Sequence, residues 1–67
     1  MDEQLHSLTR RLIELRIEHA DLDAMIDRMA GQAPLDELAL QRLKKRRLAL
    51  RDMIARLEAT TTPDDLA

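Results

Sequence analysis

A single break divides the chain, at Gly31-Gln32-Ala33-Pro34. Glycine commonly ends a helix, and proline suits the first turn of a new one. Asp36 and Glu37 follow, and negative charge is favourable near a helix N-terminus. We therefore expect one domain over residues 1–60: a helix over 3–30, a turn over 31–34, a second helix over 35–60, and then a flexible tail over 61–67.

Aliphatic residues recur at alternating intervals of three and four on both sides of the break. This heptad spacing is typical of a helix that packs lengthwise against another helix. Each series has one polar interruption. The first series is Leu5, Leu8, Leu12, Leu15, His19, Leu22, Ile26 and Met29, and the second is Leu40, Leu43, Arg47, Leu50, Ile54 and Leu57.

Folding the chain at the break brings the two series together. Facing residues of an antiparallel hairpin have a nearly constant sum of residue numbers, so Leu15 meets Leu50 and His19 meets Arg47. The two polar interruptions thus share one layer, which two unrelated helices would do only by chance. The sequence predicts an all-α fold, an antiparallel two-helix hairpin that resembles a coiled coil.

Charged residues beside the two seams favour the same register. An exposed ion pair contributes only about 0.2–1 kcal/mol, so such pairs select the register rather than hold the fold. One pair disagrees, because Arg16 is expected near Arg51. The favourable pairs are Asp23 with Lys44 and Glu18 with Arg46.

Composition narrows the range of functions. The 67 residues include no cysteine, which removes disulfides and thiolate metal sites. They include no Phe, Tyr or Trp, the side chains that stack on bases, sugars and flat cofactors. We expect no cofactor and no small-molecule substrate.

The polar side chains do not form a recognisable catalytic or metal site. Ser7 is the only serine, and no base is placed to activate it. Glu3 and His6 have a spacing seen in helical metal sites, but a site needs three or four ligands. His19 is too far from His6 to complete one. We expect that the protein is not an enzyme and holds no metal.

The N-terminal residues Met1–Gln4 are acidic and do not resemble a signal peptide. No apolar stretch approaches the length that crosses a bilayer. These features predict a cytoplasmic protein without a membrane segment.

His19 is the most informative polar residue, and two hypotheses apply to it. It could act as a pH-responsive or partner-binding group tuned by Asp23, or it could fix the register as a buried asparagine does in coiled coils. We prefer the register role. The expected polar layer comprises His19, Arg47, Asp23 and Lys44.

A second apolar stripe runs along the first helix, away from the leucine seam, and a two-helix hairpin cannot cover it. A stripe this regular usually marks an interaction surface. We expect self-association, with a dimer forming a four-helix bundle, and keep a different helical protein as the alternative partner. The expected surface consists of Ile13, Ile17, Ala20 and Ala24, extended on the second helix by Leu48 and Met53.

The second helix also carries a run of basic residues, and clustered cations can contact phosphates. Acidic residues at matching height on the first helix cancel much of this charge, and the chain has a net charge of −2. Nucleic-acid binding is therefore an alternative to protein interaction. Its expected contacts are Arg42, Lys45 and Arg46.

Polar residues set among the leucines also point to a family. Over about residues 12–58 the chain resembles the YdcH-like family of small bacterial proteins. The resemblance implies a bacterial helical hairpin without an assigned activity. Arg46-Arg47 departs from the residues that the family often has there but keeps the basic character. The matching pattern is Glu18-His19-x-x-Leu22-Asp23-x-x-Ile26, then Asp36, then Leu43-Lys44-Lys45-x-x-Leu48-x-Leu50-x-Asp52-x-Ile54.

Overall fold

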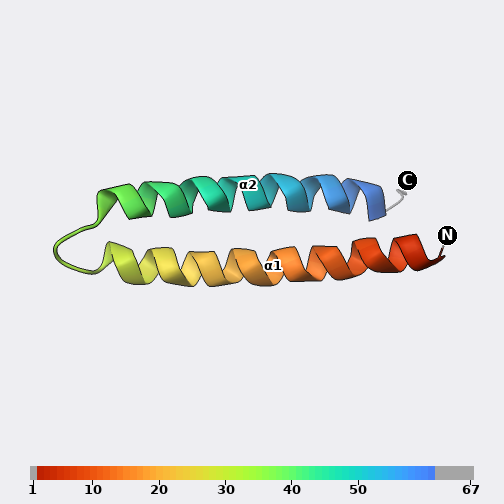
Figure 1. Cartoon of the computed structure of the whole chain (residues 1–67), viewed down its shortest axis with the longest axis horizontal. Coiled ribbons are helices and arrows are strands. Elements are labelled where there is room, and N and C mark those ends of the chain that lie inside the picture. Colours follow the sequence, from red (N-terminus) through yellow and green to blue (C-terminus); the bar gives the residue numbers. More distant parts are fainter. Residues whose placement is uncertain (1, 62–67) are drawn as a thin grey trace.

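The structure is a computed structural model that describes the backbone of residues 2–61 and the side chains of residues 7–60. Helix α1 runs over Asp2–Ala30 and helix α2 over Glu37–Thr61. The two helices lie side by side and antiparallel, so that the start of α1 and the end of α2 lie opposite the turn (Figure 1). The predicted two-helix hairpin is confirmed.

Helix α1 ends in a different way from the one that its glycine suggested. The Gly31 amide donates to the carbonyl of Arg28, and the Gln32 amide donates to that of Met29, both at 3.2 Å. These bonds span three residues and tighten the last turn, which satisfies carbonyls that the helix leaves free. Gly31 does not take a positive φ, so α1 ends without a left-handed glycine.

Helix α2 begins at Glu37, two residues later than predicted. Asp36 caps this helix, because its Oδ1 accepts a hydrogen bond from the Ala39 amide at 3.1 Å. The Asp36 carbonyl accepts the first helical bond, from the Leu40 amide at 3.0 Å. Pro34 therefore lies in the turn rather than in the first turn of the helix, since the aspartate supplies the stronger start signal.

We expect Asp36→Ala to lower the free energy of unfolding by about 1 kcal/mol, because an alanine leaves the Ala39 amide without its acceptor. Chemical denaturation followed by circular dichroism measures this change. Asp36→Asn is the matched control and should retain most of the stability, since asparagine is an equally good cap. A loss of equal size in both variants would contradict the capping role.

The core is a single aliphatic seam between the two helices. Leu15 and Leu50 form its centre and are 1% and 0% exposed. Leu22 packs in the same cluster, which Leu43, Ile54 and Leu57 border. The predicted seam thus forms the core. Its buried members are Leu12, Leu15, Leu22, Ile26, Leu40 and Leu50.

Candidate protein-interaction surface

The polar layer within the seam is built around the carboxylate of Asp23. Its Oδ1 accepts a hydrogen bond from Arg47 Nη1 at 2.9 Å. Its Oδ2 lies 3.4 Å from His19 Nδ1, one helical turn earlier on α1. One carboxylate therefore links the two residues that interrupt the leucine series, and it ties α1 to α2 at mid-height.

The partner of Asp23 was predicted wrongly as Lys44. Arg47 occupies a seam position and is half-buried, so its charge requires a nearby acceptor more than an exposed lysine does. The guanidinium also reaches one turn along α1 with several donors in a fixed plane. Lys44 is exposed and makes no ion pair within the described residues.

His19 is left with one unsatisfied nitrogen. Its Nε2 is buried and has no hydrogen-bond partner among the described residues. A buried polar atom without a partner costs about 1–3 kcal/mol. This layer therefore carries an energetic cost that an aliphatic residue would avoid.

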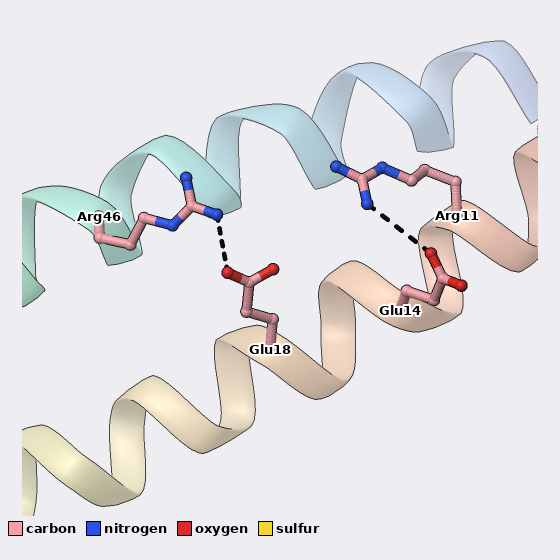
Figure 2. A network of polar contacts seen from close by, with 4 residues as sticks. All are labelled: Arg11, Glu14, Glu18 and Arg46. Carbon is pink, nitrogen blue, oxygen red and sulfur yellow. Dashed lines mark hydrogen bonds and ion pairs between the residues drawn. The ribbon is translucent and has the colours of Figure 1, made fainter.

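Two further ion pairs cross between the helices. Arg46 of α2 reaches Glu18 of α1 at 2.7 Å, as predicted (Figure 2). Arg16 pairs with Glu58 at 2.5 Å, a partner that the sequence did not predict. The carboxylate of Glu58 offsets the repulsion expected between Arg16 and Arg51.

Two other ion pairs each join side chains of a single helix. Arg11 lies 3.7 Å from Glu14 on α1, as Figure 2 also shows. Arg56 lies 3.0 Å from Asp52 on α2. All four of these side chains are more than half exposed, so each pair contributes little to stability.

The outer side of α1 carries the apolar stripe expected from the sequence. Ile13 is 52% exposed and Ile17 is 58% exposed, and they lie one turn apart. Ala20 and Ala24 continue the line and are exposed as well. We call these four residues the α1 stripe. It lies opposite the seam, where α2 cannot reach it.

The apolar residues expected on α2 behave differently from one another. Leu48 is 63% exposed, as a surface residue should be. Met53 is half-buried and packs against the Leu15, Leu22 and Leu50 cluster, so it belongs to the edge of the core. It lies three residues after Leu50, at the edge of the seam, and its place in a partner surface stays a prediction.

The structure also exposes three apolar side chains that sequence reasoning missed. They are Met25 on α1, Leu35 in the turn and Leu38 in the first turn of α2. Leu38 could have been found from its position two residues before Leu40, because that spacing turns it away from the seam.

Charge is divided unevenly between the helices. Helix α1 has seven acidic and four basic side chains, and α2 has three and seven, so their formal net charges are −3 and +4. Of the expected nucleic-acid contacts, Arg42 and Lys45 are exposed and form no ion pair within residues 7–60. Arg46 is bound to Glu18.

Nothing among the described side chains groups three potential metal ligands. The side chains of Glu3 and His6 lie outside the described residues, as does most of the predicted tail. Neither described helix has an apolar window long enough to cross a membrane.

Comparison with known proteins places the hairpin in a family. Searches of curated proteins and of solved structures gave no match. Residues 12–58 match the model of a family described as a protein of unknown function, DUF465. The matched segment includes the seam from Leu12 to Leu57, the polar layer and the turn. The chain therefore belongs to the DUF465 family.

Proposed function

We propose that this protein is a non-catalytic interaction module that acts by packing the α1 stripe against a second helical surface. The observation that carries the proposal is the exposure of Ile13 and Ile17 on consecutive turns. Regular apolar stripes of this kind usually serve association. A second copy of the chain is the preferred partner, and a different helical protein is the alternative.

The energetics indicate a weak, concentration-dependent assembly. Full burial of an isoleucine contributes about 1.5–3 kcal/mol, and both stripe isoleucines are already about half covered. Two copies would bury four such side chains and gain about 3–6 kcal/mol. Association itself costs at least about 4 kcal/mol, so other contacts must add to the apolar gain.

We expect Ile13→Glu to prevent this assembly, because it places a charge within the buried apolar surface. Light scattering with refractive-index detection, over a concentration series, measures the mass. The wild type should rise toward twice the mass of the hairpin, and the variant should stay at the mass of one.

The matched control is Leu38→Glu. Leu38 is 62% exposed but lies outside the α1 stripe, and glutamate is favourable in the first turn of a helix. This control should associate as the wild type does. Equal association of Ile13→Glu and the wild type, with both folded by circular dichroism, would disprove the proposed role of the stripe.

Nucleic-acid binding is the second candidate function. It is favoured by the unpaired cations Arg42 and Lys45 and weakened by the pairing of Arg46 with Glu18. A mobility shift that fades as salt rises would support it, because phosphate contacts depend on counterion release. We also propose that the chain is YdcH-like and of bacterial origin, on the resemblance described above, and that it is cytoplasmic.

A further inference from the structure

The α1 stripe is bounded by two opposite charges. Arg10 lies three residues before Ile13, and Asp27 lies three residues after Ala24. Both are exposed, and neither forms an ion pair within the described residues. In contrast, Arg11, Arg16 and Asp23 are already paired within the hairpin.

Six residues thus follow one line on the outer side of α1, at intervals of three, four, three, four and three. In order they carry a positive charge, two large apolar groups, two small apolar groups and a negative charge. The line is centred between residues 18 and 19. Its members are Arg10, Ile13, Ile17, Ala20, Ala24 and Asp27.

This line of side chains is complementary to the same line on a second α1 helix only when the two helices run in opposite directions. An antiparallel copy of α1, aligned at the same centre, places Ile17 against the partner's Ala20 and Ile13 against the partner's Ala24. Each large side chain then faces a small one, which allows two helices to approach closely and interlock. At each end, Arg10 faces the partner's Asp27. A parallel copy would instead place isoleucine on isoleucine and arginine on arginine.

We propose that the protein forms a symmetric dimer in which α1 packs antiparallel on α1 of the partner subunit in this register. This inference rests on the proposed function and specifies its partner. The two end pairs add the contacts that the apolar stripe alone does not supply. The two α1 helices form the middle of the dimer and the two α2 helices lie outside, with Arg42 and Lys45 left exposed on both flanks.

The competing arrangement lays α1 on α2 of the partner subunit, and the net charges of −3 and +4 favour it. Two observations favour the α1 pairing. Three of the seven cations of α2 are already bound to carboxylates of the same hairpin. Over the described part of α2, no outer apolar line matches the α1 stripe, since Met53 belongs to the core edge.

A charge-exchange cycle tests the register. Arg10→Glu and Asp27→Arg each place like charges at both ends of the interface, and each should weaken dimerisation about tenfold. The double variant restores both pairs with exchanged signs and should dimerise within about threefold of the wild type. Because the double variant keeps the wild-type net charge of −2, a general charge effect cannot explain its recovery.

Lys45→Glu is the control, since Lys45 is exposed and unpaired but lies on α2. It should leave dimerisation unchanged, whereas a loss would favour the α1-on-α2 arrangement and overturn the inference. If Ile13→Glu abolishes association but the cycle shows no recovery, the register is wrong and the proposed function stands. A wild type that stays monomeric up to about 1 mM, where binding is worth only about 4 kcal/mol, overturns the dimer and leaves a different helical protein as the partner of the α1 stripe.

A distance measurement gives an independent test. The chain has no cysteine, so Arg28→Cys takes a single spin label. In the proposed register, the two labelled positions lie 19 residues apart along the paired helices, or about 28 Å at 1.5 Å per residue. A parallel α1 pair, or α1 packed on the partner's α2 with both turns at the same end, would place them within about 10–15 Å. An α1-on-α2 dimer with its turns at opposite ends also gives a long distance, and the Lys45→Glu control distinguishes it from the α1 pair. The longer distance supports the inference, and the shorter one overturns it.

Discussion

Leu50→Ala should remove much or all of the stability of the hairpin. Leu50 is fully buried between the helices and packs against Leu15 and Leu22. Removing a buried leucine side chain costs about 2–5 kcal/mol, because the cavity adds to the lost burial. A chain of 67 residues is expected to have a total stability of about 3–10 kcal/mol. One truncation at the centre of the seam therefore removes much or all of that stability.

Far-ultraviolet circular dichroism with thermal denaturation measures this loss at a concentration below that of association. Leu38→Ala is the matched control, with the same atoms removed from a side chain that is 62% exposed. It should change the free energy of unfolding by less than about 0.5 kcal/mol. Similar melting curves for the two variants would mean that the seam is not what holds the hairpin together.

The fold could be predicted because the signals for it are redundant. Heptad spacing on both sides of one break, with His19 and Arg47 at matching positions, allows only one antiparallel register. The residues that end α1 and begin α2 were harder to predict from the sequence. Gly31, Pro34 and Asp36 are all helix-boundary residues, and the sequence does not say which of them acts. In the structure the hydrogen bond from the Ala39 amide to Asp36 decides the start of α2.

The candidate surface was predictable only in part, because side-chain reach is not encoded in heptad positions. Exposure of Ile13 and Ile17 follows directly from their place opposite the seam. Asp23 has Arg47 and Lys44 on neighbouring turns, and only the burial of Arg47 explains why it takes the arginine. Met53 could lie outward or fold inward, and its flexible chain covers the core.

His19→Leu should make the hairpin more stable but less uniquely folded. The substitution removes the unsatisfied Nε2, whose burial costs about 1–3 kcal/mol, and loses only a long contact of 3.4 Å to Asp23. Arg47 keeps its hydrogen bond to Asp23. We expect a net gain of about 1–2 kcal/mol, which raises the melting temperature by about 4–8 °C for each kcal/mol in a domain of this size.

The loss of uniqueness follows from the same change. With leucine in this layer, α1 would present an unbroken aliphatic seam, and only Arg47 with the ion pairs between the helices would oppose a shift of one heptad. Amide correlation spectra should then show additional peaks, or light scattering should show additional oligomers. Gln41→Leu is the matched control, because it adds a leucine at an exposed position of α2 and should change neither property.

The opposite result would revise the role of His19. A less stable variant would mean that the imidazole contributes favourable contacts through Nδ1 that outweigh the orphaned Nε2. A more stable variant that keeps a single set of peaks would mean that other pairs, such as Arg46 with Glu18 and Arg16 with Glu58, already fix the register. His19 would then destabilise the hairpin without being needed for its register. A role in binding would become the best explanation for this histidine.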